Sequence, residues 1–320
     1  MKQILIYYIN SLIMLILVLM LIMVSVAFFT LLERKMMGLF HYRKGPNKIS
    51  IMGILQPFSD AMKLLSKEQM TLIKSNHKLF IMSPMFLFMS TMMLWMLYPF
   101  FTNLMNMKLS SFLFLCIMSI SIYGLMFSGW SSNSSFSMLG SIRSIAQSIS
   151  YEVIFSINLL IWMMINNSLN LFNLKFIQTY TPSFMLNVCI SLIFLIWILA
   201  EINRTPFDLS EGESELVSGF NVEYSSSLFT LIFLAEYASY MFMMMMMNYL
   251  ILYINPKNLI FYVNIIMLIY IFTWVRMTFP RMRYDKLMYL CWFYMLPIIL
   301  IMFMIMMLIK MMIDMNNFNM

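Results

Sequence analysis

The run ILIYYINSLIMLILVLMLIMVSVAFFTLL, residues 4–32, carries no charged side chain and decides the fold class. A helix needs about 20 apolar residues to cross a bilayer, and this run exceeds that length. Comparable runs recur along the 320-residue chain, which is 62% hydrophobic, only 10% charged and has a mean hydropathy of +0.85. The sequence therefore predicts an all-α membrane protein.

Hydropathy predicts about eight transmembrane helices within a single polytopic domain that covers residues 1–320. The predicted spans lie near residues 4–32, 79–101, 110–129, 142–166, 183–202, 226–252, 259–278 and 287–313. The first run is too long for the core of a signal peptide, and no small-residue cleavage site follows it. We therefore expect the first helix to remain in the mature protein.

A shorter segment between the first and second spans, about residues 51–67, has a different pattern. Ile54, Phe58 and Leu65 recur at helical spacing, whereas Asp60 and Lys63 fall on another side. The segment is too short to cross a bilayer, so we expect an amphipathic helix that lies in the membrane interface. Packing on a soluble partner is an alternative that does not exclude the first.

The basic residues are distributed asymmetrically between the loops. Fifteen of the twenty Lys and Arg residues lie in the loops after the first, third, fifth and seventh predicted spans. The positive-inside rule puts these loops on the cytoplasm-like side, which is the matrix in a mitochondrion. Both termini are then expected to face the intermembrane space.

The methionine content points to an organelle genome. The 42 Met residues are spread over every segment, as expected of an A/T-rich genome that reads ATA as Met. No Arg-rich, Ser-rich import peptide is visible, which agrees with organelle encoding. A need for flexible, polarisable side chains is the physical alternative. We expect an organelle-encoded, multi-pass protein of the mitochondrial inner membrane.

The cysteines and histidines give no sign of a metal or redox centre. Cys116, Cys189 and Cys291 lie far apart in apolar runs, and the two histidines, His41 and His77, lie near the loop after the first span. The chain contains no CxxC pair, no GxGxxG motif and no P-loop. We therefore expect this chain alone to bind no metal, iron–sulfur cluster or haem.

Acidic residues are concentrated in one stretch. Residues 201–223, EINRTPFDLSEGESELVSGFNVE, hold six of the thirteen Asp and Glu residues. These six are Glu201, Asp208, Glu211, Glu213, Glu215 and Glu223. Charge within a bilayer is costly and marks a functional site by default. The alternative is a solvated loop, about residues 203–225, that happens to be acidic.

Two further glutamates lie inside predicted spans. Glu152 is in the fourth span and Glu236 in the sixth, and Glu201 ends the fifth. Because burial disfavours the charged form of a carboxyl group, three such groups that converge in a bundle could relay protons. The alternative is that each glutamate makes one salt bridge or hydrogen bond that fixes helix packing.

The spacing of the loop acids leaves their conformation open. Glu211, Glu213 and Glu215 alternate, so an extended backbone would direct all three to one side, whereas a helix would scatter them. Like charges repel at short range, so basic partners are expected. The arginines on the same predicted membrane face are Arg143, Arg204, Arg281 and Arg283.

Six motifs together resemble one family. They are LLERK (31–35), RKGPN (43–47), QPFSDAMKLLSKE (56–68), SIAQSISYE (144–152), NRTPFDLSEGESELVSGFNVEY (203–224) and PRMRYDKLM (280–288). In this order they resemble the mitochondrial NADH–ubiquinone oxidoreductase chain 1 family, the membrane subunits of respiratory complex I beside its peripheral arm. Lipid headgroup anchoring is the alternative explanation for the two basic motifs that follow the first span.

The resemblance implies a ubiquinone tunnel formed by the first, interfacial and sixth helices. The implied tunnel residues are Arg34, Arg43, Asp60, Ala61, Lys63 and Phe229. The implied proton-coupling residues are Glu152, Glu201, Asp208, Glu211, Glu213, Glu215, Glu223 and Glu236. Ubiquinone is the implied substrate, while FMN and iron–sulfur clusters belong to partner subunits. The implied partners are the other membrane-arm subunits, the iron–sulfur subunits nearest the quinone and membrane lipids, with no nucleic acid.

Two other functions remain possible from the residues alone. One is a stand-alone cation or proton transporter that uses the same glutamates, and the other is a membrane anchor of an energy-converting hydrogenase that uses no quinone. The highly charged loops on one face favour a chain that docks soluble proteins over a lone transporter. The methionine bias argues against the hydrogenase, so we favour the quinone-site and coupling subunit.

Overall fold

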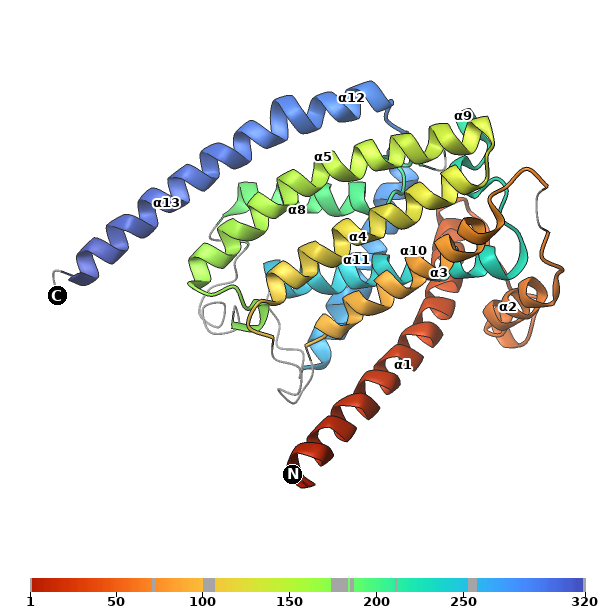
Figure 1. Ribbon diagram of the computed structural model, residues 1–320, viewed down its shortest axis with the longest axis horizontal. Helices are drawn as coiled ribbons and strands as arrows, with labels where there is room; N and C mark the ends of the chain where they lie inside the picture. The colour runs from red at the N-terminus through yellow and green to blue at the C-terminus, as the bar shows by residue number, and fades with distance from the viewer. Residues whose placement is uncertain are drawn as a thin grey trace.

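The computed structural model describes residues 2–70, 73–99, 107–173, 184, 187–210, 212–252 and 258–318. All regular secondary structure in these ranges is helical, which confirms the prediction of an all-α membrane protein (Figure 1). The eight longest helices are α1 (Lys2–Phe40), α3 (His77–Leu94), α4 (Ser110–Ser131), α5 (Ser135–Asn166), α8 (Val188–Glu201), α10 (Ser226–Met247), α11 (Leu259–Thr278) and α13 (Leu296–Phe318).

Shorter helical elements connect or extend the long ones. The α-helical elements are α2 (Gln56–Ser66), α9 (Glu213–Leu216) and α12 (Tyr284–Tyr289). The 3₁₀ turns are η1 (Ile51–Gly53), η2 (Trp95–Leu97), η3 (Leu171–Asn173) and η4 (Gly219–Asn221). There are also two π-helical stretches. The first, η5 (Asn248–Leu252), continues α10, and the second, η6 (Leu290–Met295), precedes α13.

Within the described residues, seven helical segments are long and apolar enough to cross a membrane. They are Ile6–Phe40, His77–Leu97, Ser110–Ser131, Ser135–Ile165, Ser226–Leu252, Leu259–Thr278 and Tyr284–Met312. The fifth predicted span is represented by α8, a shorter apolar helix. The fourth span begins at Ser135 instead of the predicted residue 142, because its serine-rich first turns lower the hydropathy without breaking the helix.

The long helices run side by side in one bundle (Figure 1). Helix α3 packs on α4 and α10, α4 on α5, and α5 on α8 and α13, while α1 contacts α10 and α11. The short elements α2 and α9 lie at one end of the bundle, and both termini point away from that end (Figure 1). The loops after alternate spans therefore gather at the same end.

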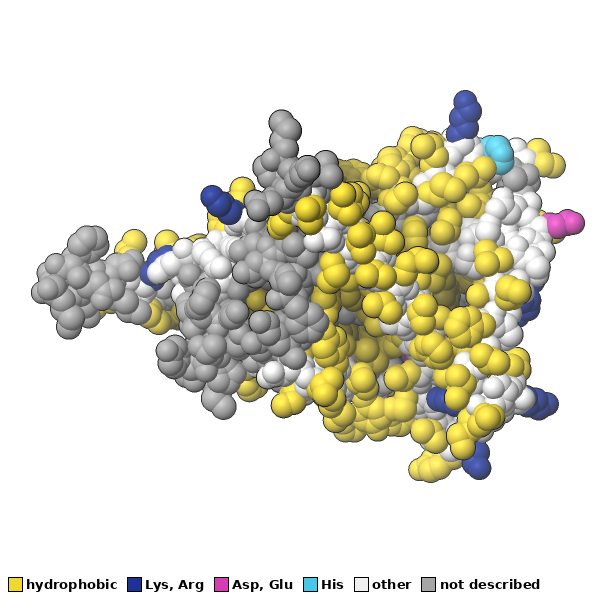
Figure 2. All heavy atoms as spheres, turned by 90° about the horizontal axis from the view of Figure 1, so that it is seen from below, with side chains coloured by type: hydrophobic (Ala, Val, Ile, Leu, Met, Phe, Trp, Pro, Cys, Tyr) yellow, Lys and Arg dark blue, Asp and Glu magenta, His cyan; other side chains and the backbone are white. Residues whose placement is uncertain are grey.

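The outer helices present apolar surface. The most apolar windows of α1 and of the α12–α13 segment are only 17% and 11% buried. Figure 2 shows hydrophobic side chains spread over most of the described part of one face of the bundle, with most of the visible charges at the end that carries α2 and α9. This distribution is the one expected when lipid tails, not water, cover the sides of the bundle.

Helix α2 has the amphipathic character that the sequence predicts. Its first turn buries Pro57, whereas Phe58, Met62 and Leu65 are exposed. Its bounds are shorter than the predicted segment, because Gly53 has a positive φ of 78° and separates the η1 turn from the helix. A side chain at Gly53 would collide with the carbonyl group of Pro46.

Candidate functional site

The acidic segment after α8 folds into turns and a short helix. Gly212 adopts a left-handed conformation with φ 34°, and its carbonyl oxygen accepts hydrogen bonds from the Glu215 and Leu216 amides at 2.8 Å. Residues 213–216 therefore form α9, and an extended backbone is wrong for this part of the segment. Glu211 and the side chain of Glu213 lie outside the described residues.

Within the described residues, Arg281 and Arg143, two of the four arginines proposed as partners, pair with carboxylates of the acidic segment. Arg281 Nη2 lies 2.9 Å from Asp208 Oδ2. Arg143 Nη1, on α5, lies 2.5 Å from Glu215 Oε2. These pairs connect the acidic segment to α5 and to the chain that leads into α12. Glu223, near the end of the segment, is half-buried.

The other two arginines, Arg204 and Arg283, pair with carboxylates outside the segment. Arg204 Nη2 lies 3.7 Å from Glu236 Oε2, and its guanidinium carbon lies 4.9 Å from the centre of the Tyr237 ring on α10. Arg283 pairs at 2.9 Å with the nearby Asp285, and both side chains are exposed. The structure thus brings Arg204 to an intramembrane glutamate and leaves Arg283 outside the acidic set.

Glu152 and Glu201 lie on α5 and α8, two helices that pack on each other. Both residues are half-buried, and their carboxyl groups lie close enough to interact electrostatically. The Gln147 side-chain amide donates to the carbonyl oxygens of Ala200 at 2.8 Å and Phe207 at 3.2 Å, which fixes the end of α8 against α5. Two neighbouring carboxyl groups in a low-dielectric site titrate as a pair and can exchange a proton.

A second charged cluster lies between α1, α10 and α11, and the sequence interpretation did not single it out. Glu33 is only 5% exposed. Its Oε2 accepts a hydrogen bond from the Tyr237 hydroxyl at 2.6 Å, and its Oε1 pairs with Arg276 Nη1. One buried carboxylate therefore holds three membrane helices together.

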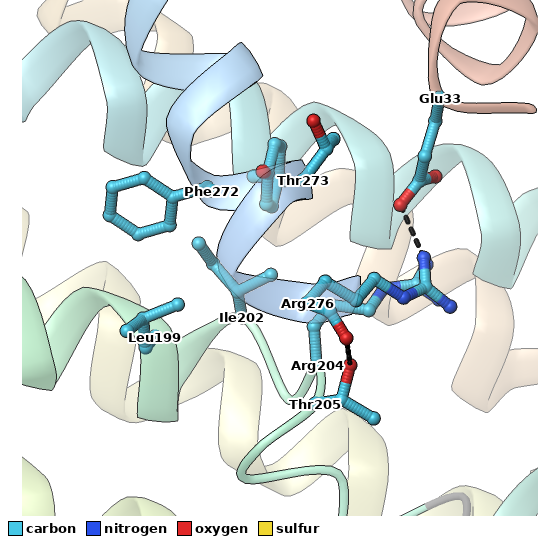
Figure 3. A pocket seen from close by; sticks show the side chains of 9 residues that line it. Glu33, Leu199, Ile202, Arg204, Thr205, Phe272, Thr273 and Arg276 are labelled. Carbon is cyan, nitrogen blue, oxygen red and sulfur yellow. Dashed lines mark hydrogen bonds and ion pairs between the residues drawn. The ribbon is translucent and has the colours of Figure 1, made fainter. Parts of the chain in front are cut away.

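A small pocket adjoins this cluster (Figure 3). Glu33 points at Arg276, and the carbonyl oxygen of Arg276 accepts a hydrogen bond from Thr205 Oγ1 at 3.2 Å. The apolar wall is formed by Leu199, Ile202 and Phe272. The pocket thus joins the end of α8, which carries the Glu201 carboxyl, to the charges around Glu33.

The signal for this cluster was present in the sequence. Arg276 ends an otherwise uncharged apolar run, residues 259–275, and Glu33 directly follows the first span. An ionisable residue beside or within a span is a site hypothesis by default. The sequence does not show that Glu33 faces the interior of the bundle, because Glu33 lies next to Arg34 and Lys35. The three residues together have the pattern of a headgroup anchor.

The residues of the implied tunnel gather around α2. Arg34 Nη1 lies 2.7 Å from Asp60 Oδ2, which links α1 to α2. Ala61 and Lys63 are exposed on α2, and Arg43 is exposed in the turn after α1. The structure therefore brings Arg34 and Asp60 together and leaves the other three at the surface of the isolated chain.

A row of aromatic rings on α10 connects these two regions. Phe229, Phe233 and Tyr237 follow at helical spacing, and the ring centres of successive residues lie 5.1 Å apart. The row lies on α10, a helix that also packs on α2, and it ends at the hydroxyl group that binds Glu33. Phe229 itself is half-buried.

Tyr224 anchors the end of the acidic segment. Its hydroxyl group lies 2.9 Å from Ser83 Oγ and 3.3 Å from Ser131 Oγ, and its ring stacks on Phe80 with centres 4.2 Å apart. Burial raises the pKa of Tyr224, although these hydrogen bonds oppose the rise. The neutral hydroxyl therefore fastens the segment to α3 and α4.

Among the described residues, no group of three or more His, Cys, Asp or Glu side chains could hold a metal ion. The chemistry available from the described side chains is proton exchange between carboxyl groups and charge stabilisation by arginines. An arrangement of this kind can move or hold protons in response to a nearby change of charge.

Comparison with known proteins identifies the family. The model of the NADH dehydrogenase family matches residues 13–307. NADH-ubiquinone oxidoreductase chain 1 of Aedes aegypti is 46% identical over 290 residues, which is 91% of this chain and 93% of that protein. The Locusta migratoria protein of the same name is 47% identical over 87% of this chain and 88% of its own length. The Monodelphis domestica protein is 43% identical over 87% and 90%. The chain therefore belongs to the NADH dehydrogenase family.

Proposed function

We propose that this chain is a core membrane subunit of the proton-translocating NADH:ubiquinone oxidoreductase of the mitochondrial inner membrane. The family membership and the names of its relatives support this role. In this proposal the chain holds no redox cofactor, ubiquinone is the substrate, and FMN and iron–sulfur clusters belong to partner subunits. The partners are other membrane-arm subunits and the iron–sulfur subunits nearest the quinone.

The proposed quinone tunnel lies between α1, α2 and α10. Arg34 and Asp60 pair across α1 and α2, and the Phe229 ring begins the aromatic row on α10. Ala61 and Lys63 complete the set on α2, and Arg43 lies in the turn after α1. Apolar and aromatic walls suit the isoprenoid tail of ubiquinone, which is itself apolar.

One observation carries the proposed coupling role, namely the continuity of charged groups across the bundle. Glu236 pairs with Arg204, which lies three residues after Glu201, and Glu201 interacts electrostatically with Glu152 on α5. Asp208, Glu215 and Glu223 extend this set along the acidic segment, together with Glu211 and Glu213. A change of charge at the quinone would shift protons along such a set, because neighbouring ionisable groups titrate together.

The proposed orientation puts the α2 and α9 end of the bundle in the matrix and both termini in the intermembrane space. Fifteen of the twenty basic residues lie in the loops assigned to the matrix, which supports the orientation. The methionine bias supports encoding by the organelle.

Purification in mild detergent of an affinity-tagged chain from its own mitochondria tests this function. We expect flavin, iron–sulfur signals and inhibitor-sensitive NADH–quinone reductase activity to copurify with the chain. An untagged strain carried through the same steps is the control. A homogeneous chain without flavin, which moves cations when reconstituted alone, would instead establish a stand-alone transporter.

A further inference from the structure

Helix α5 presents a stripe of four buried polar side chains to α8. Gln147, Tyr151, Asn158 and Trp162 recur at helical spacing and are at most 1% exposed. Two of them contact the α8 backbone, since Gln147 donates to Ala200 and Asn158 Nδ2 donates to the Ile190 carbonyl oxygen at 3.2 Å. The stripe therefore follows the antiparallel seam between α5 and α8 for about 22 Å.

Each of the four side chains has a polar atom with no hydrogen-bond partner in the described part of the chain. The atoms are Gln147 Oε1, Tyr151 OH, Asn158 Oδ1 and Trp162 Nε1. Unsatisfied polar atoms are costly in the interior of a membrane protein, where bulk water does not reach. Four of them on one stripe therefore require an explanation.

The four atoms form two complementary couples. Asn158 Oδ1 can only accept a hydrogen bond and Trp162 Nε1 can only donate one, and the two residues lie one helical turn apart. Gln147 Oε1 is likewise an acceptor one turn from the Tyr151 hydroxyl, which can donate. A water molecule accepts and donates at once, so it can satisfy both members of a couple, and buried water in proteins occupies positions of this kind.

An aromatic stack lies between the two couples. The rings of Phe155 and Trp197 are parallel within 11°, their centres are 3.7 Å apart, and both residues are 1% exposed. Phe155 lies between Tyr151 and Asn158 along α5, and Trp197 lies between the Ile190 and Ala200 contacts along α8. The faces of the two rings fill the middle of the seam with apolar surface, whereas Trp197 Nε1, at the edge of its ring, is a further buried N–H group without a hydrogen-bond partner in the described part of the chain.

We propose that the seam between α5 and α8 binds ordered water at two separate sites, and that the stacked rings of Phe155 and Trp197 keep the two sites apart. The first site is formed by Gln147 and Tyr151, and the second by Asn158 and Trp162. A continuous file of water through the bundle would conduct protons and dissipate a gradient. The stack interrupts that file, so water can be bound between the two helices without conducting protons across the membrane.

High-resolution electron cryomicroscopy of the complete purified assembly tests the water sites. We expect density about 3 Å from both Asn158 Oδ1 and Trp162 Nε1, and a second density shared by Gln147 and Tyr151. The double variant Asn158→Leu with Trp162→Phe should lose the first density and keep the second. Direct contact between the side chains of each couple, or a dry seam at a resolution that shows other buried water, would overturn the proposal.

The control for these variants is Trp95→Phe. It removes an indole N–H that already donates to the Ala238 carbonyl oxygen at 3.2 Å, away from the seam. Both seam densities should remain in this variant. Their loss would mean that the densities follow general changes in packing and not the polar groups of the seam.

Passive proton leak tests the stack. Purified assemblies are reconstituted in liposomes with an imposed pH gradient and no substrate, so the result does not depend on the proposed function. We expect Phe155→Ala to leak several-fold faster than the unmodified assembly, and Phe155→Leu to leak less than Phe155→Ala. Phe114→Ala is the matched control, because Phe114 contacts Phe155 from α4 with ring centres 5.3 Å apart but lies outside the seam. Equal leak rates in all four samples would refute the role of the stack.

Discussion

Two successive residues of α1, Glu33 and Arg34, lie in different environments because they point to different sides of the helix. Glu33 and Arg34 differ by about 100° around the helix axis. Glu33 therefore points into the bundle, where its side chain is 6% exposed, whereas Arg34 points to α2 with 41% of its side chain exposed. The same sequence motif thus supplies a buried carboxylate that connects α1 to α10 and α11, and an arginine that forms a surface ion pair with α2.

This difference predicts how sensitive the cluster is to substitution. Glu33→Gln leaves the Arg276 guanidinium without its counter-charge and should destabilise the assembly by roughly 3 kcal/mol, since broken buried ion pairs are costly. Tyr237→Phe removes one hydrogen bond to a charged group and should cost about 2 kcal/mol. Thermal unfolding of the two purified variants shows which one is less stable. A larger loss of stability in Tyr237→Phe than in Glu33→Gln would contradict the central role of Glu33 in this cluster.

The carboxyl pair on α5 and α8 makes a prediction about coupling. Glu152→Gln or Glu201→Gln should lower coupled quinone reductase activity by at least roughly tenfold, because each change removes a proton acceptor while keeping the side-chain shape. Assembly, judged by copurifying flavin, should be largely unchanged. Glu68→Gln, in the exposed segment after α2, is the control. Normal proton pumping in both buried variants would refute the relay.

At the scale of secondary-structure elements, α2 combines two contacts of different strength. Pro57 buries its ring at the start of the helix, and Asp60 pairs with Arg34 on α1. Exposed ion pairs of this kind contribute at most about 1 kcal/mol, so burial of the first turn contributes more to docking. Substitutions on the outward face of α2 can therefore change function without loss of the fold.

Ala61→Thr separates tunnel lining from packing. Ala61 is exposed in the isolated chain, so two additional heavy atoms should leave the stability of the fold unchanged. If Ala61 lines the quinone tunnel, the Michaelis constant for quinone should rise several-fold and inhibitor sensitivity should change. Ser66→Thr adds a methyl group on the same helix and is the control. Unchanged quinone kinetics in Ala61→Thr would show that the side chain lies outside the tunnel.

The acidic segment docks on α5 through a close approach of two glycines. A Cβ atom at Gly140 would lie 2.9 Å from Gly219 Cα, which is backbone and cannot rotate away. We expect Gly140→Ala to displace the segment and to cost about 1–3 kcal/mol, as overpacking does. Protease sensitivity of residues 203–225 in the assembled protein measures the displacement.

Gly124→Ala is the matched comparison for this variant. Its added Cβ atom would meet the Leu87 side chain, 2.6 Å from both Cγ and Cδ2, and not the backbone of the acidic segment. It should therefore leave the protease sensitivity of residues 203–225 unchanged. Equal sensitivity in the two variants would show that the glycine contact does not position the segment.

At the scale of the whole molecule, the cost of burying charge in lipid restricts where the few charged residues can lie. The described part of the face in Figure 2 is largely apolar, and most of the charges visible there lie at the end that carries α2 and α9. A chain with such sides has one favourable position in a bilayer, because every exposed charge must reach water or a headgroup.

Side-specific labelling tests the proposed orientation. Lys48→Cys lies in an exposed loop near α2, and Lys108→Cys lies in an exposed turn before α4, at the other end. A membrane-impermeant maleimide should label Lys108→Cys in intact mitoplasts and Lys48→Cys only in inverted vesicles. The unmodified chain is the control for its three native cysteines. The reverse pattern would invert the orientation.

The sequence by itself determined the membrane class and the family, and it located seven of the eight predicted spans, while the fifth corresponds to the shorter apolar helix α8. Uncharged runs of sufficient length leave a helix as the only way to satisfy the backbone in lipid, so the spans needed no tertiary information. The interfacial helix followed from its own periodicity. Motifs such as residues 203–224 named the family because their residue order is specific.

Only the tertiary structure decided which charges meet. Arg143 and Glu215 are 72 residues apart, and Glu33 and Arg276 are 243 residues apart, so their contact depends on helix packing. Helix phase buried Glu33 beside an exposed neighbour, and the left-handed Gly212 turned an alternating acidic run into a helix. Local patterns decide which segments form helices, whereas the pairing of ionisable groups depends on distances that arise only when the helices pack.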